Sequence, residues 1–330
     1  MHRGCKNPPK DVQSMAMSPD GRYVYCLGQT VFVFDRETGA KQRLPAMGNT
    51  VPFLSPDGRF LGGVHPSRTS QDTMEVTLWR VGETHEEAFP RVKIRSQIPP
   101  FHPCFTADGA YILLDAHPFN RRTQTPMSQL WAVSTADGSA RMVHEFGPDE
   151  SIWHMDSGPH GVLVSIHSRA DNIHHQHLLL FTALDEPPRR IDLSLASPLF
   201  HMDLSACWLP DGQVLMQYHQ GNGEPGVHLQ RLALPEKIIN PASQQFIPCI
   251  GPHVVFSPDG QYAALHRGNP VPPEDAPDKD NLIVVCRMNP WQQTFAHPCE
   301  YLPEIRFSPD SQWLLVSGEE PLMEPRESWQ

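Results

Sequence analysis

Histidine and glutamate recur at one fixed spacing from a repeated Asp-Gly pair. The chain has 330 residues, of which 18 are histidine. Six positions before the Asp of this pair, or before its counterpart, stand three histidines and one glutamate: His102, His154, His253 and Glu304. Neutral imidazoles together with a carboxylate can ligate a divalent transition metal. This set is therefore the candidate metal site of the sequence.

A second group of histidines stands seven to nine positions after the same Asp or its counterpart. It consists of His65, His117, His167, His219 and His266. Arginines follow in the same segments, namely Arg68, Arg121, Arg122, Arg169 and Arg267. Guanidinium groups bind carboxylates and phosphates in a bidentate manner. These histidines, with Arg121, Arg122 and Arg267, are therefore the candidate binding residues for an anionic ligand.

An internal repeat positions both groups. Segments of the type "FSPDG" place the recurring Asp at Asp20, Asp57, Asp108, Asp211, Asp259 and Asp310. The interval of 103 residues after Asp108 is about twice its neighbours, so a degenerate copy is expected near residue 160. "HMDSGPHGVLVSIHS" stands there, with His160-Gly161 in place of Asp-Gly. The sequence thus contains seven repeat units.

Each unit begins as a β-hairpin. In "HVVFSPDGQYAALH" two apolar runs flank Pro-Asp-Gly, whose fixed proline φ and permissive glycine favour a tight reversal. A third and often a fourth apolar run follow, as in "EVTLWRVG" and "RVKIRS". Four short strands per unit, apolar on both sides, are typical of a propeller blade packed between two neighbours. A β-sandwich would not repeat its turn so regularly, and no helical periodicity supports a solenoid.

We therefore predict an all-β fold, a seven-unit β-propeller of four-stranded blades in one domain over residues 1–330. The blades are expected to start near residues 12, 49, 100, 152, 203, 251 and 302. Only "EEPLMEPRESWQ" follows the first two strands of the last unit, so we expect that blade to be incomplete. Either closure is irregular or the chain is part of a longer one. Because the second strand of a blade returns alongside the first, both histidine groups and Glu304 are predicted at one mouth of the propeller.

The "FSPDG" segments with their flanking apolar strands resemble the SPDG-type, WD-like propeller repeats of TolB-type proteins, prolyl-oligopeptidase propellers and oligogalacturonate lyases. The resemblance extends over nearly the whole chain, although the Gly-His and Trp-Asp dipeptides of true WD repeats are absent. It implies the fold and says little about function, because propellers host binding, scaffolding and several chemistries. Oligogalacturonate lyases are similar in outline: the resemblance implies a histidine-bound divalent metal at the mouth and β-elimination of an acidic sugar. Their ligand cluster does not match this sequence residue by residue.

Composition narrows the partners and the compartment. A net charge of −11 without a basic run argues against nucleic acid or an anionic membrane as partner. No apolar run is long enough for a membrane span, and "MHRGCKNPPK" at the start lacks the apolar stretch of a signal peptide. Seven scattered cysteines without a CxxC pair indicate a reducing compartment. We therefore expect a cytoplasmic location.

Two functions fit these patterns. The first is a non-catalytic binding or scaffolding module whose histidine-rich face engages a protein partner or an anionic ligand, without a cofactor. The alternative is a metal-dependent lyase or hydrolase acting on an acidic saccharide, with His102, His154, His253 and Glu304 holding a divalent transition metal. In that case Arg121, Arg122 or Arg267 would hold the anion. The histidines after the turn can also be purely structural, since one ring nitrogen can bond a loop carbonyl.

Overall fold

Short antiparallel β-strands make up nearly all of the regular structure in the computed structural model. It describes residues 12, 14–27, 31–44, 53–67, 69–70, 72–82, 86–88, 90–97, 103–120, 125–170, 173–193, 205–209, 211–218, 227–233, 238–239, 245–247, 254–267, 282–288, 291–299, 305–317 and 322–329. The single helix in these ranges is the 3₁₀ helix η2 (Arg326–Trp329). No helix of the described residues is long and apolar enough to cross a membrane.

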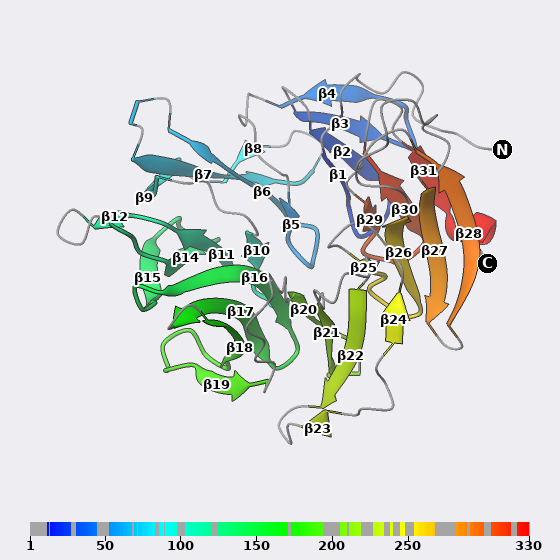
Figure 1. Cartoon of the computed structure of the whole chain (residues 1–330). Helices are drawn as coiled ribbons and strands as arrows, with labels where there is room; N and C mark the ends of the chain where they lie inside the picture. Colours follow the sequence, from blue (N-terminus) through cyan, green and yellow to red (C-terminus); the bar gives the residue numbers. More distant parts are fainter. Residues whose placement is uncertain are drawn as a thin grey trace, which may run out of the picture. The chain divides into compact units, whose positions relative to one another are not determined.

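The chain forms two compact units, and the first contains blades 1, 6 and 7 (Figure 1). Blade 1 consists of β1 (Ser14–Met17), β2 (Tyr23–Leu27), β3 (Val31–Asp35) and β4 (Lys41–Arg43). Blade 6 consists of β25 (Val254–Phe256), β26 (Tyr262–Arg267), β27 (Leu282–Met288) and β28 (Trp291–Pro298). Blade 7 has three strands in the described ranges, β29 (Ile305–Phe307), β30 (Trp313–Val316) and β31 (Leu322–Pro325). The last blade is therefore short of one strand there, as the sequence predicts.

The second unit contains blades 2 to 5. Blade 2 consists of β5 (Phe53–Leu54), β6 (Phe60–Pro66) and β7 (Thr73–Arg80), with β8 (Glu86–Glu87) and β9 (Val92–Arg95) both paired to β7. Blade 3 consists of β10 (Cys104–Phe105), β11 (Tyr111–Ala116), β14 (Gln129–Ser134) and β15 (Ala140–Glu145). A small hairpin, β12 (Phe119–Asn120) and β13 (Thr125–Pro126), lies between β11 and β14 in the chain.

Blades 4 and 5 complete this unit. Blade 4 consists of β16 (Glu150–Gly158), β17 (Gly161–Ala170), β18 (Ile173–Phe181) and β19 (Arg189–Asp192). Blade 5 consists of β20 (Ser205–Trp208), β21 (Val214–Tyr218) and β22 (Val227–Ala233), with β23 (Ile238–Ile239) and β24 (Gln245–Ile247) both paired to β22. Blade strands pair antiparallel in or near chain order, as in propeller blades. The seven-unit β-propeller fold predicted from the sequence is confirmed.

The recurring turn is held by its own side chains. In five repeats the Ser or Thr hydroxyl donates to the Asp Oδ1 at 2.5 to 2.7 Å. The amide N–H two residues after the Asp donates to the same oxygen at 3.0 Å. The glycine after the Asp has φ between 66° and 77° in five repeats, a conformation that glycine adopts without steric cost. The Asp side chain therefore stabilises the hairpin turn, because its Oδ1 accepts both the hydroxyl and the amide hydrogen bond.

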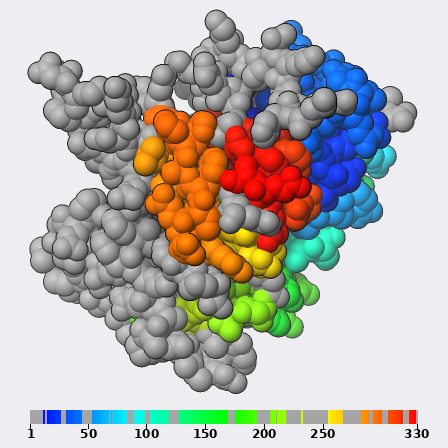
Figure 2. Space-filling view, turned by 90° about the vertical axis from the view of Figure 1, so that its right-hand side faces the viewer, coloured from blue at the N-terminus to red at the C-terminus, as the bar shows by residue number. Residues whose placement is uncertain are grey.

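The apolar core lies between successive blades. Val76, Leu78, Ile112 and Leu114 pack blade 2 against blade 3, and similar clusters join blades 3 to 4, 4 to 5 and 6 to 7. Within the first unit, blade 7 also packs against blade 1, where its red strands lie beside the blue ones (Figure 2). The Arg36 guanidinium there lies 4.0 Å from the centre of the Trp313 ring. The last blade is thus joined directly to the first.

Candidate functional site

The predicted metal site falls mostly outside the described residues. His102, His253 and Glu304 lie there, as do the predicted binding residues His219, Arg121 and Arg122, and Arg68. The side chains of Arg169 and Arg267 are also outside what the structure describes. Within the described ranges, no three His, Cys, Asp or Glu side chains form a group that could hold a metal ion. The metal site and the arginine contacts stay predictions.

In blade 2, His65 is packed beside a buried carboxylate. His65 is next to last in β6 and 3% exposed, and its Nδ1 lies 3.2 Å from the carbonyl oxygen of the following residue. Glu75 pairs with it on β7 and accepts a 2.7 Å hydrogen bond from the Ser67 hydroxyl. Arg91 and Lys93 lie 3.6 and 3.8 Å from its carboxylate oxygens. The Ser67 bond and these charges hold the pKa of Glu75 below its usual value, so a charged network supports this strand end.

In blade 3, His117 belongs to a chain of buried hydrogen-bonding groups. Its Nε2 lies 2.9 Å from Asp115 Oδ2, and its Nδ1 lies 3.4 Å from the Ser128 hydroxyl. Its backbone N–H donates to Ser96 Oγ, which follows β9 of blade 2. The Ser-His-Asp order looks like a nucleophilic triad, but each of these three side chains belongs to a residue that is at most 7% exposed. The group therefore joins blades 2 and 3 and presents no accessible nucleophile.

In blade 4, a β-bulge interrupts the register between β16 and β17. Ile152 pairs with Ile166, but His154 pairs with Ser165, so Trp153 has no partner across the pair. Trp153 is 41% exposed, although tryptophan is usually well buried. His154 and His167, the predicted histidines of this blade, are half-buried in β16 and β17. The exposure of Trp153 is not predictable from the sequence, because the order of apolar residues in "ESIWHMDSG" does not indicate a bulge.

Burial lowers the pKa of two further histidines and keeps them neutral near pH 7. His266 in β26 is 6% exposed, and neither ring nitrogen has a hydrogen-bond partner in the described part of the chain. His177 in β18 is 2% exposed, and its Nε2 lies 3.7 Å from a Glu150 oxygen. His65, His117 and His266 are thus all more than nine-tenths buried. Their binding role stays a prediction, and Trp153 is the large exposed aromatic side chain of the described part of blade 4.

Comparison with known proteins supports the fold. No protein-family model matches the sequence, and no curated protein sequence matches it. Among solved structures, an oligogalacturonate lyase in complex with manganese has a TM-score of 0.66 at 13% identity, over 97% of this chain and 91% of that one. The Kuenenia stuttgartiensis hydrazine synthase has a TM-score of 0.62 at 10% identity, over 98% of both chains. The RRP9 WD40 repeats give 0.61 at 11% identity, over 96% and 90%.

These structural neighbours include an enzyme and WD40 repeat propellers. At such low identity the likeness extends to the fold alone, and one propeller fold carries many activities. The resemblance to WD-like propeller repeats is confirmed at this level.

Proposed function

We propose that this protein is a non-catalytic β-propeller module that binds a protein partner, with Trp153 of blade 4 as an anchor. The observation that carries this proposal is the exposed indole on the edge strand β16. Trp153 is 41% exposed in a blade whose other apolar strand residues are nearly all buried. Tryptophan is one of the residue types enriched among interface residues that carry large binding energies.

The bulge supports a binding role because it sets the direction of this side chain. In a regular register, the residues of β16 would alternate between the two sides of the blade, which pack on neighbouring blades. The extra residue removes Trp153 from that alternation, and bulges of this kind often re-aim a side chain beside a functional site. An exposed indole kept in this way offers a large rigid surface that a partner pocket can cover.

The chemistry around Trp153 favours a protein partner over a small anion. The indole is uncharged, and Asp149 and Glu150 precede it in the chain, so the nearest charges in sequence would repel an anion. Half-buried His154 follows it directly. A partner with an apolar pocket and a polar rim matches this arrangement.

We infer a cytoplasmic location for this module. The described cysteines Cys104, Cys207 and Cys299 are free thiols. Free thiols persist in reducing compartments, which supports the location expected from the sequence.

The test compares two exposed apolar side chains. Wild-type protein, Trp153→Ala and Met142→Ala are used to capture partners from the native extract, and captured proteins are quantified. Met142 in β15 is 45% exposed and serves as the matched control. We expect one or more proteins to be retained by wild type and Met142→Ala and lost from Trp153→Ala. With the purified partner, Trp153→Ala should weaken binding about 30-fold, as for an interface residue of this kind.

Two outcomes would count against the proposal. If Trp153→Ala retains the same proteins as wild type at the same level, the indole is not an anchor. If wild type retains nothing above a blank resin, the binding function itself loses its support. Circular dichroism of both variants must match wild type, so that lost binding is not mistaken for lost folding.

A further inference from the structure

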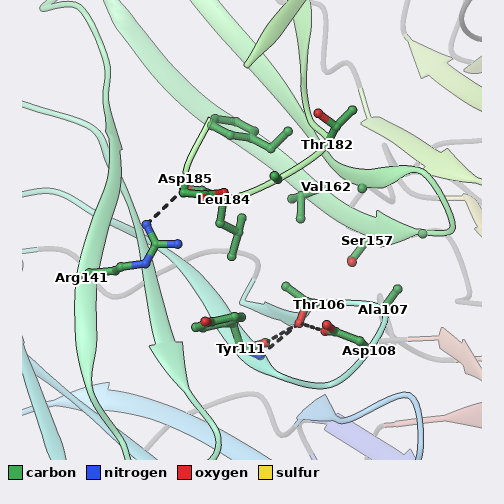
Figure 3. A pocket seen from close by; sticks show the side chains of 14 residues that line it. Thr106, Ala107, Asp108, Tyr111, Arg141, Ser157, Val162, Thr182, Leu184 and Asp185 are labelled. Carbon is green, nitrogen blue, oxygen red and sulfur yellow. Dashed lines mark hydrogen bonds between the residues drawn. The ribbon is translucent and has the colours of Figure 1, made fainter. Parts of the chain in front are cut away.

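A groove lies between blades 3 and 4 and is not used by the proposed protein contact. Its volume is about 430 Å³, within the range of small-molecule sites. The walls come from the β10–β11 turn, β15, the β16–β17 hairpin and residues 181–185 (Figure 3). Arg141 and Asp108 stand on opposite sides of the hollow, with Tyr111 between them.

The degenerate fourth repeat opens this groove. Between blades 2 and 3, the Asp57 side chain lies 3.7 Å from where a Cβ on Gly109 would stand, so the two turns are packed together. In blade 4 the hairpin is shorter, with Gly158 paired directly to Gly161. A Cβ on Gly161 would meet the Phe181 carbonyl oxygen at 2.1 Å, so this turn lies against the end of β18. Asp108 is not among the three atoms nearest to this Cβ position, in contrast to Asp57 beside Gly109. The Asp108 carboxylate lines the groove.

The second carboxylate oxygen of Asp108 lacks the arginine partner that three counterparts of Asp108 have in the described part of the chain. Its Oδ1 accepts the Thr106 hydroxyl and the Ala110 N–H, like the other turns. In other repeats the second oxygen is paired with an arginine: Asp57 with Arg59, Asp211 with Arg231 and Asp259 with Arg326. In the third repeat Ala110 replaces the arginine that follows the turn in blade 2, and no described cation forms an ion pair with Asp108. The Thr106 bond lowers the pKa of Asp108, so its charge is present at neutral pH.

The opposite wall holds one positive and one negative charge. Arg141 in β15 donates from Nη1 to the Leu184 carbonyl oxygen at 3.1 Å. This bond places the guanidinium beside Asp185, the next residue in the chain (Figure 3). Among the described residues neither Arg141 nor Asp185 forms an ion pair, and both are exposed. An α-amino acid carries a carboxylate and an ammonium on the same carbon, which matches this neighbouring pair of opposite charges.

We propose that the groove binds a basic α-amino acid. The cationic side chain pairs with Asp108 Oδ2, as the chain's own arginines do in three other repeats. The α-carboxylate pairs with Arg141 and the α-ammonium with Asp185. The aliphatic stem lies along Tyr111 and Leu184, which are half-buried in the groove wall.

Isothermal titration of the full chain with L-arginine tests this assignment. Three analogues dissect it: citrulline has a neutral side chain, agmatine lacks the carboxylate, and the amide of N-acetylarginine lacks both α-charges. Each lost charged contact should weaken binding about tenfold or more. Among variants, Asp108→Asn and Arg141→Gln should weaken L-arginine binding to the same degree. Asp20→Asn, which alters the equivalent turn of blade 1, should bind like wild type.

Arg141 is exposed, so Arg141→Gln keeps the test valid even if Asp108→Asn disturbs its turn. No heat from L-arginine at millimolar concentration would overturn the proposal. Equal affinity of wild type and Arg141→Gln would overturn the placement of the carboxylate. Equal affinity for L-arginine and the amide of N-acetylarginine would mean that the groove recognises an arginine side chain alone, and would overturn its assignment as an amino-acid site.

Discussion

Asp156 of β16 makes the stability of this protein depend on pH in a defined direction. One carboxylate oxygen of Asp156 accepts a 2.7 Å hydrogen bond from the backbone N–H of Trp208. This bond links blade 4 to β20 of blade 5. Burial raises the pKa of Asp156 to about 6, against an ordinary value of 3.8, and the Trp208 bond offsets only part of this. Cys104 and Cys207 are near enough to interact with its charge, and burial raises the pKa of both thiols, so both stay neutral beside the carboxylate.

The sign follows from proton binding. Between about pH 4 and pH 6 the folded state binds the Asp156 proton and the unfolded state does not, so the free energy of unfolding falls as pH rises through this window. Above about pH 6 the destabilisation is fully present. A difference of roughly two pKa units corresponds to about 3 kcal/mol, and this is an upper bound because Asp156 keeps some exposed surface.

Asp156→Asn removes the charge and leaves an amide oxygen for the Trp208 N–H. We expect this variant to be more stable than wild type by up to about 3 kcal/mol at pH 7, with the difference shrinking toward zero near pH 4. Urea unfolding at several pH values measures it, and Glu186→Gln, at an exposed carboxylate, is the control. A difference between wild type and Asp156→Asn that stays constant from pH 4 to pH 7 would refute the reasoning.

Two further changes probe the contacts between blades. Gly158→Ala should destabilise the protein by about 1–3 kcal/mol, because its Cβ would stand 2.2 Å from the Trp208 ring, whereas Gly82→Ala has open space and should change stability little. A urea midpoint for Gly158→Ala equal to that of Gly82→Ala would contradict this packing. His117→Ala should cost about 3–5 kcal/mol, because it removes one hydrogen-bonding partner, at 2.9 Å, of the Asp115 carboxylate, which is 1% exposed. A loss below about 1 kcal/mol would mean that other groups hold this carboxylate.

Local signals predicted the repeating framework well. A Ser-Pro-Asp-Gly turn sets its own geometry, because the hydroxyl, the carboxylate and the glycine φ act within five residues. The degenerate fourth copy was predicted from spacing, and its hairpin lies at the expected place between β16 and β17. His65 and His266 stand next to last in their strands, as their spacing from the turn Asp indicated.

The surroundings of those side chains were not predictable in the same way. The bond from His117 to Asp115 has a local signal in "LLDAH", but its link to Ser96 depends on how β9 packs beside β11. The exposure of Trp153 depends on a register shift that the pattern of residue types does not encode. The groove beside Asp108 exists because the next turn is short, which matters only once two blades are packed together.

The sequence by itself determined the number of repeats, the turn chemistry and the all-β propeller fold, because turns and short apolar strands are encoded by neighbouring residues. Tertiary structure decided which polar groups are buried, which charges are paired and which aromatic side chain faces solvent. Those properties depend on residues more than fifty positions apart in the chain. Trp208 bonds Asp156, 52 positions away, and Arg326 pairs with Asp259, 67 positions away. Such contacts form only when separate blades pack together, so a single stretch of sequence does not contain them.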